Sequence, residues 1–165
     1  MITESDIVLR LLLAAGLGGV IGFERERAHK VAGLRTHSIV SVGAALFSLV
    51  SIFLFENFPS VNGVSGFDYH LIANVIVGIG FIGGGAILRQ GPRVLGTTTA
   101  ATLWLVAGVG LASGIGFTYG AVAAAVIGYV LLTLLWQIEK KYIRDKLPYQ
   151  NLDEPNESEI ARHAD

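Results

Sequence analysis

Five apolar segments divide the sequence, and each approaches the length that a helix needs to cross a hydrocarbon layer about 30 Å thick. They cover residues 7–23, 38–55, 71–88, 98–113 and 117–136. Hydrophobic residues make up 52% of the 165-residue chain and charged residues only 15%, so little polar surface is left to keep such helices in water. We predict an all-α polytopic membrane protein, with a bundle of five transmembrane helices in one domain of residues 1–136.

The basic residues indicate how these helices are oriented. The connector 24–36 holds four of the twelve lysines and arginines, the third loop holds Arg89 and Arg93, and residues after 136 hold five. Cytoplasmic loops carry an excess of Lys and Arg, so we expect the N-terminus outside and the C-terminus in the cytoplasm. The remaining basic residue, Arg10, lies within the first segment, where it can snorkel to the interface or pair with an acidic residue.

Residues 137–165 form a predicted cytoplasmic tail. The tail begins as a basic extension of the fifth helix and becomes acidic and polar after Pro148. Such a composition cannot bury enough apolar surface to fold, so we expect the tail to be partly disordered. Cysteine is absent from the chain, which excludes a disulfide framework and a thiolate metal site.

Small residues recur at four-residue spacing in four of the five segments. Such rows allow helix backbones to approach closely inside a membrane, where van der Waals contact replaces the hydrophobic driving force. The rows are consistent with packing inside the chain, with a homo-oligomer and with docking to another membrane protein. The glycines predicted to pack helices are Gly18, Gly22, Gly80, Gly84, Gly110, Gly114, Gly120 and Gly128.

The connector between the first two segments is the densest cluster of charge in the apolar part of the chain. On a helix that continues out of the membrane, Glu24 would face Arg27 and Glu26 would face Lys30, both favourable pairs. Gly33 would then end that helix, and Thr36 would cap the next one. One interpretation is a solvated turn. The other is a charged site at the cytoplasmic face, able to hold an anionic lipid head group or a partner's carboxylates, built from Glu24, Arg25, Gly33, Arg35, Thr36, Arg89 and Arg93.

Polar side chains inside the predicted spans are few. Asn74, Thr102 and Trp104 are the candidates there, and an interhelical hydrogen bond is the expected role of Asn74. No Asp or Glu lies at mid-membrane, which argues against a carboxylate-lined ion path. The four histidines are scattered at interfaces and in the tail, so no catalytic constellation emerges. We therefore expect no enzyme, no cofactor and no nucleic-acid partner; Mg²⁺ could bind, but no spacing supports a site.

Two blocks of this sequence resemble the MgtC/SapB family of bacterial inner-membrane proteins. The first runs from Gly19 through Glu24, Arg25, Gly33, Arg35 and Thr36 to Ala45, and the second from Gly78 through Arg89, Gly96 and the run Thr98–Trp104 to Gly110. The resemblance covers roughly residues 8–130. Members of that family are five-helix membrane proteins, and many carry a cytosolic ACT-like domain that the 29-residue tail here cannot form.

The resemblance implies a role in Mg²⁺ homeostasis or adaptation to magnesium limitation, at the bacterial inner membrane and, in some pathogens, in virulence. It further implies contacts with membrane lipids and with other inner-membrane proteins, including the ATP synthase. Our leading hypothesis is therefore a non-enzymatic protein that acts through such contacts. The alternative is a transporter or channel for a cation such as Mg²⁺, with the glycine-rich third helix lining the path.

Overall fold

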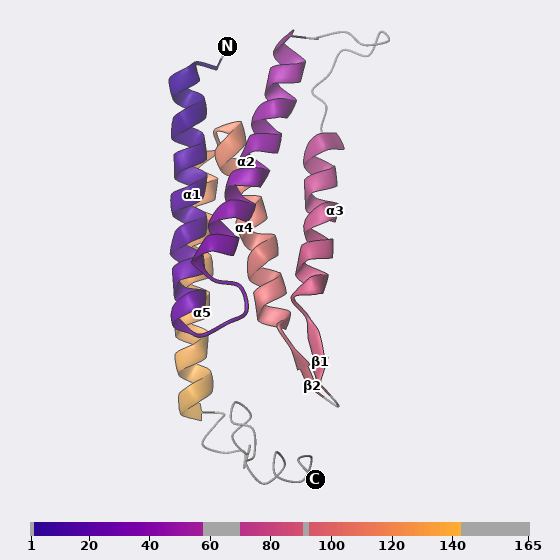
Figure 1. Ribbon diagram of the computed structural model, residues 1–165. Helices are drawn as coiled ribbons and strands as arrows, with labels where there is room; N and C mark the ends of the chain where they lie inside the picture. The colour runs from indigo at the N-terminus through magenta and orange to yellow at the C-terminus, as the bar shows by residue number, and fades with distance from the viewer. Residues whose placement is uncertain (1, 58–69, 91–92, 143–165) are drawn as a thin grey trace. The chain divides into compact units, whose positions relative to one another are not determined.

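The computed structural model describes residues 2–57, 70–90 and 93–142 of the chain. In these ranges five helices and one hairpin follow each other (Figure 1): α1 Glu4–Arg27, α2 Leu34–Asn57, α3 His70–Gly85, β1 Leu88–Gln90, β2 Arg93–Leu95, α4 Thr97–Ile115 and α5 Thr118–Tyr142. The predicted all-helical class is confirmed, with the hairpin as its one addition in the described ranges. Helices α1, α2, α4 and α5 are long and apolar enough to cross a membrane, whereas α3 has only 16 residues. Five spans and an outer N-terminus stay predictions.

The predicted third segment, 71–88, is wrong at its end. Helix α3 stops at Gly85, and Leu88 already belongs to β1. Three successive glycines at the end of α3 weaken the helix, and the chain then pairs antiparallel with β2, Leu88 opposite Leu95 and Arg89 opposite Val94. Gly96 returns the chain into α4 with a φ of 86°, a left-handed conformation that suits glycine.

The chain divides into two compact units, Met1–Leu132 and Thr133–Asp165. Of the second unit the structure describes only the last turns of α5. The rest of the predicted tail, from residue 143, lies outside the described residues, and so does most of the predicted outer loop between α2 and α3. The arrangement that follows is that of the first unit.

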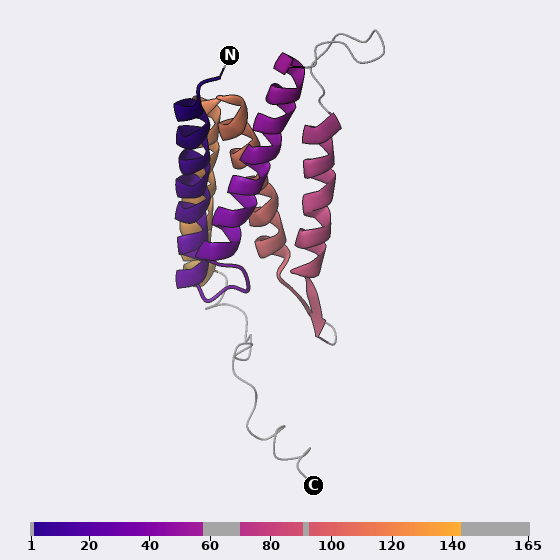
Figure 2. The same ribbon diagram turned by 45° about the horizontal axis from the view of Figure 1, so that its top comes forward.

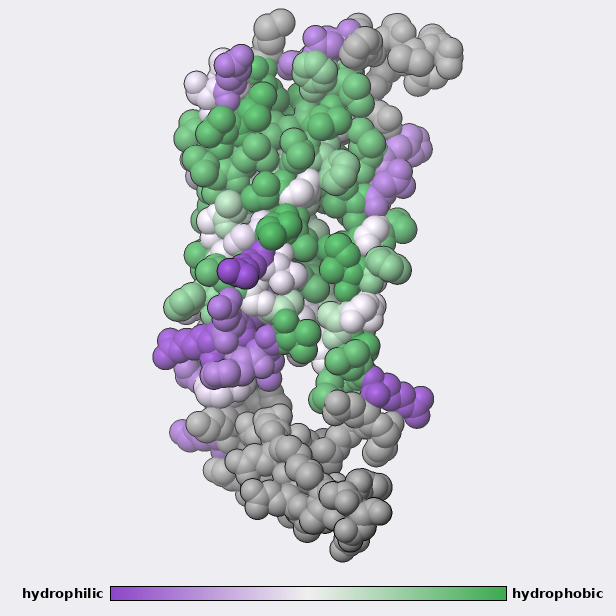
Figure 3. Space-filling model, in the orientation of Figure 1, coloured by the Kyte–Doolittle hydropathy of each residue, from purple (hydrophilic) through white to green (hydrophobic). Residues whose placement is uncertain are grey.

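Helix α4 is the centre of the first unit. Its residues Val106 and Val109 join a core cluster with Ile21 of α1 and Ala121 and Ala125 of α5. A second cluster joins Ala107 and Leu111 of α4 to Ala44 of α2 and Ile79 of α3. Helices α1 and α3 accordingly lie on opposite sides of α4 (Figures 1 and 2). The face of the molecule seen in Figure 3 is largely hydrophobic over the middle of the helices, and many of its hydrophilic side chains lie toward the ends.

The predicted glycine rows differ in what they contact. A Cβ atom at Gly18 or Gly22 of α1 would lie 2.7 Å or 2.8 Å from a Cβ atom of α2, and one at Gly110 would lie 2.8 Å from the carbonyl carbon of Ser41 and closer still to its oxygen. Gly114 meets Ala45 of α2 in the same way, and Gly128 of α5 meets Leu105 of α4. Glycine is therefore needed where α2 crosses α1 and α4.

The remaining three predicted packing glycines make no such contact within the described chain. A Cβ atom at Gly80 or Gly84 would meet nothing within 4 Å, and one at Gly120 would meet only Phe117 of the preceding turn. On α3 the buried residues are Ile79 and Gly83, and not these glycines, so of the three roles left open by the sequence, contact with a second copy and docking to another membrane protein stay predictions for them.

Arg10 ties the start of α1 to the end of α4. Its Nη1 donates a hydrogen bond of 2.8 Å to the carbonyl oxygen of Gly114. The last carbonyls of a helix lack partners within the helix and carry partial negative charge, so a guanidinium stabilises them. Arg10 thus has a partner that the sequence did not indicate, a backbone carbonyl of another helix.

Replacing Arg10 with methionine should lower the free energy of unfolding by about 1.5 kcal/mol, the value of a hydrogen bond to a charged group. Methionine keeps the apolar stem and removes only the donor. Unfolding of the purified protein in mixed micelles measures the change. Leu9→Met is the control, since Leu9 is exposed; equal stability of the two variants would contradict the role of Arg10.

Candidate functional site

Five polar residues meet where α1 ends and where α2 and α4 begin. This polar cluster consists of Glu24, Arg25, His37, Thr99 and Thr102. Four of its members are buried: the exposed fraction is 5% for Arg25, 0% for His37, 2% for Thr99 and 4% for Thr102. Such burial of polar groups near the end of a membrane-type bundle is costly, so the contacts of each group decide what the cluster can do.

The glycines of α1 create the cluster by bringing α2 close. At Gly22 a Cβ atom would lie 2.8 Å from the Cβ of His37 and from the Cα of Leu34. With the two backbones this close, the imidazole of His37 lies between α1 and α4. A larger residue at Gly22 would separate the helices and open the cluster.

His37 connects three segments through its two ring nitrogens. Nδ1 lies 2.9 Å from the carbonyl oxygen of Gly33, and because a carbonyl only accepts, Nδ1 is the donor. Nε2 lies 3.0 Å from Oγ1 of Thr102, and that hydroxyl also lies 2.9 Å from the carbonyl oxygen of Thr99. The single hydroxyl proton serves one of these two acceptors at a time. The network therefore ties the connector to α4 through one side chain.

Glu24 and Arg25 form an ion pair that is too long for a hydrogen bond. Nη1 of Arg25 lies 3.8 Å from Oε2 of Glu24, with side chains 6% and 15% exposed. Within the described residues, neither that carboxylate oxygen nor Nε of Arg25 has a hydrogen-bond partner. A buried guanidinium with an unused donor is strongly destabilising by itself. Nε of Arg25 is thus a buried donor for which the described part of the chain provides no acceptor.

The connector differs from the prediction at both helix ends. Helix α1 stops at Arg27, and the left-handed residue that follows is His29, with a φ of 53°, rather than Gly33. Glu26 does not form the side-chain pair with Lys30 that was predicted on a continuing helix. Its Oε2 instead accepts a 2.8 Å hydrogen bond from the backbone N–H of Leu34. Thr36 was wrongly predicted as the cap, because α2 already begins at Leu34 and the carboxylate of Glu26 satisfies its first donor.

Gly33 has two other roles at this point of the connector. Its carbonyl oxygen accepts from His37, and a Cβ atom on it would lie 2.7 Å from Oε2 of Glu26. A side chain there would displace the carboxylate that begins α2. Gly33 therefore holds the connector in place, which makes it part of the site's support.

The other predicted cations are not in the polar cluster. Arg35 is exposed and Thr36 is half-buried on the first turn of α2, and Arg89 is exposed on β1. Arg93 lies in β2, opposite Gln90, and its side chain is outside the described residues. Of the predicted charged site, Arg25 is thus buried and Glu24 nearly so, whereas Arg35 and Arg89 are exposed.

The three predicted polar residues of the spans also separate. Thr102 is in the cluster, whereas Trp104 is 59% exposed on α4. Asn74 is exposed on α3 and makes no hydrogen bond among the described residues, so the interhelical bond predicted for it is absent there.

His37 was not predicted as a site residue, although the sequence contains a signal for it. His37, Ser41, Ser48 and Ser51 recur along one side of α2, and all four are buried. Polar residues at helical spacing in an apolar helix face protein and not lipid. That row, set against the glycines of α1 and α4, could have placed His37 in the interior.

The comparisons with known proteins identify the family of this chain. The model of the MgtC family matches residues 11–141, a range that contains most of α1, nearly all of α5, the three helices between them and the whole polar cluster. The chain belongs to the MgtC family. With its apolar helices, this membership makes it a membrane protein. No solved structure matches it.

Three relatives show how far the similarity extends. The chain is 37% identical to the "Putative magnesium transporter YhiD" of Escherichia coli K12 over 83% of its length, and 42% identical to "Protein MgtC" of Salmonella typhimurium LT2 over 73%. It is 36% identical to "Protein SapB" of Bacillus subtilis 168 over 90%. The matched regions span 66%, 48% and 65% of these relatives, so the chain spans about two thirds of their length or less.

Proposed function

We propose that the chain is a non-enzymatic, multi-pass protein of a bacterial inner membrane that serves Mg²⁺ homeostasis by contacting other membrane proteins. The link to magnesium is supported by family membership and by the printed name of one relative, a putative magnesium transporter. The proposed contact with other membrane proteins is supported by the polar cluster.

The observation that carries the proposal is the unsatisfied guanidinium of Arg25. Its Nε is buried without a partner among the described residues, and its ion pair with Glu24 is long. A carboxylate from a partner protein would supply the missing acceptor, and charge-assisted hydrogen bonds of this kind are the strong ones. The same fixed positive charge, in surroundings of low dielectric, repels a divalent cation. The cluster thus favours an acidic partner over passage of Mg²⁺.

Arg25→Gln should abolish growth in low magnesium of a strain that depends on this protein, whereas Lys30→Gln should leave growth unchanged. Both substitutions remove one positive charge from the same end of α1, but Lys30 is exposed. Loss of one partner of a buried charge pair weakens an interface by about 2–5 kcal/mol, at least 30-fold in affinity. Growth rate at limiting Mg²⁺ is the measurement, with membrane levels of each variant determined by blotting.

A second variant separates function from folding. Glu24→Gln with Arg25→Met removes both charges and leaves no uncompensated ion, so the bundle should fold at least as well as the parent. The proposal expects this variant to reach normal membrane levels and still fail to support growth. Normal growth of either Arg25 variant would refute the proposal.

The alternative function is cation transport, which the printed name of the relative from Escherichia coli favours. It would appear as selective Mg²⁺ flux into liposomes that hold the purified chain, with flux lowered by Asn74→Leu. Under our proposal these liposomes show no flux above that of empty ones. Mg²⁺ flux that depends on Asn74 would refute the proposed contact function and would favour transport.

A further inference from the structure

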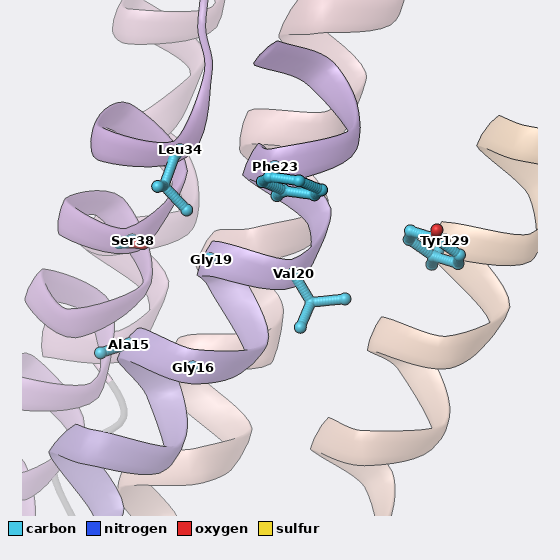
Figure 4. A pocket seen from close by; sticks show the side chains of 8 residues that line it. All are labelled: Ala15, Gly16, Gly19, Val20, Phe23, Leu34, Ser38 and Tyr129. Carbon is cyan, nitrogen blue, oxygen red and sulfur yellow. The ribbon is translucent and has the colours of Figure 1, made fainter. Parts of the chain in front are cut away.

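An apolar groove lies along α1, beside the polar cluster and separate from it. Its volume is about 660 Å³. Its lining residues come from α1, from the first turns of α2 and from the middle of α5, and they include Gly16, Val20, Phe23, Leu34 and Tyr129. Val20 and Phe23 point toward Tyr129 across the groove, and Leu34 lies on the other side of α1 (Figure 4). Sites for small apolar ligands commonly measure about 300–1,000 Å³, so the groove is large enough for one.

The groove is deep at Gly16, which has no side chain, and the side chains of Val20 and Phe23 form its walls. A Cβ atom at Gly16 would meet nothing within 4 Å. Val20 and Phe23 are 50% and 59% exposed, so they project as walls and are not flattened onto the bundle. A helix with its side chains is about 10–12 Å across and packs best on a small-residue surface without such projections. A slim, flexible chain suits this groove better.

Two exposed cations stand at one end of the groove. Gly16, Val20, Phe23 and Arg27 follow each other at spacings of four, three and four residues, which places them on one face of α1. Arg27 is thus about one turn beyond the groove, and Arg35 adjoins Leu34 at the start of α2; both are exposed. The carboxylate of Glu26 is fixed at the same end by the N–H of Leu34, and the two arginines outnumber this one negative charge.

We propose that this groove binds one anionic phospholipid. An acyl chain lies along the Gly16–Phe23 face of α1, and the phosphate is held by Arg27 and Arg35. The apolar groove matches the acyl chain of such a lipid, and the two cations at its end match the phosphate. The lipid would belong to the bilayer leaflet beside the connector. Arginine is the residue best suited to phosphate, since its fork of donors matches the phosphate oxygens. The inference is independent of the proposed function, because neither cation belongs to the polar cluster.

Native mass spectrometry of the full chain released from detergent tests this site. Phosphatidylglycerol and phosphatidylcholine with the same acyl chains are titrated separately, and glycerol phosphate serves as the headgroup alone. We expect one phosphatidylglycerol bound per chain, weaker binding of phosphatidylcholine and no binding of glycerol phosphate. Equal affinity for the two lipids, or tight binding of glycerol phosphate, would overturn the proposal.

Matched variants locate the lipid. Gly16→Leu should weaken phosphatidylglycerol binding roughly tenfold, the effect of displacing about two methylenes, and Gly78→Leu on the exposed face of α3, equally open in this structure, should not. Arg27→Gln should weaken it about fivefold, and Lys30→Gln should not.

Two results would contradict the assignment. One is unchanged lipid binding by both Gly16→Leu and Arg27→Gln. The other is a shift of Gly16→Leu from dimer to monomer with lipid binding intact, which would show that a helix of a second copy occupies the groove.

Discussion

Replacing Gly110 with valine is expected to lower the free energy of unfolding by about 3 kcal/mol, the upper part of the range for overpacking. A Cβ atom at Gly110 would lie 2.8 Å from the carbonyl carbon and 2.9 Å from the Cα of Ser41. These are backbone atoms of α2, so no side chain can rotate away to make room. The two helices would have to separate, and the buried contacts of Ser48 with Ala44 and Leu111 lie in the same interface.

Gly108→Val is the matched control for this prediction. Gly108 lies on α4 two residues earlier, and a Cβ atom there would meet nothing within 4 Å. Since valine is a slightly better helix former than glycine, the control should change stability by no more than about 0.5 kcal/mol. Both variants are unfolded in mixed micelles. A Gly110 variant as stable as the control would show that α2 and α4 do not make this close contact.

His37→Ala should lower the free energy of unfolding by about 3 kcal/mol, because it leaves a cavity and removes two hydrogen bonds. The ring is fully buried and contacts both Gly33 and Thr102. Thr102→Val, which keeps the shape and removes the hydroxyl, should cost about 1 kcal/mol. In the double variant, the loss of stability should be about 1 kcal/mol smaller than the sum of the losses in the two single variants, because the shared hydrogen bond is lost only once.

The double-mutant cycle distinguishes this bond from general packing. Ser113→Ala is the control partner: Ser113 is on the same helix as Thr102, is buried, and donates to Val109. Its effect and that of His37→Ala should add within about 0.5 kcal/mol. A coupling between His37 and Thr102 no larger than this would contradict the tie between connector and α4.

The helices could be predicted from the sequence because each apolar segment exceeds the length of an ordinary helix. Their ends could not, since these depend on contacts that are distant in sequence. Helix α2 begins at Leu34 because Glu26, eight residues earlier, accepts its first N–H. Helix α3 ends at Gly85, and the following residues pair as a hairpin, a result that the apolar pattern through Leu88 did not indicate.

The candidate site, like the helices, could be predicted from the sequence only in part. Glu24 and Arg25 were indicated by their charge, and Thr102 by its place in an apolar segment. What joins them is His37, whose importance depends on helix packing. Sequence spacing between His37 and Thr102 is 65 residues, and only the close approach of α2 to the glycines of α1 and α4 brings them together. The exposed cations Arg35 and Arg89 could not be separated from Arg25 by charge alone.

The connector between α1 and α2 has a consequence for the order of assembly. Its polar contacts are local: Glu26 with Leu34, and His37 with Gly33. The polar contacts of the turn can therefore form as soon as residue 37 has been made, and once α2 is complete at Asn57 the first two helices can enter a bilayer together as a hairpin. The contact of His37 with Thr102 must wait for α4. Until then the imidazole lacks its second partner, so the arrival of α4 completes the polar contacts of the first hairpin.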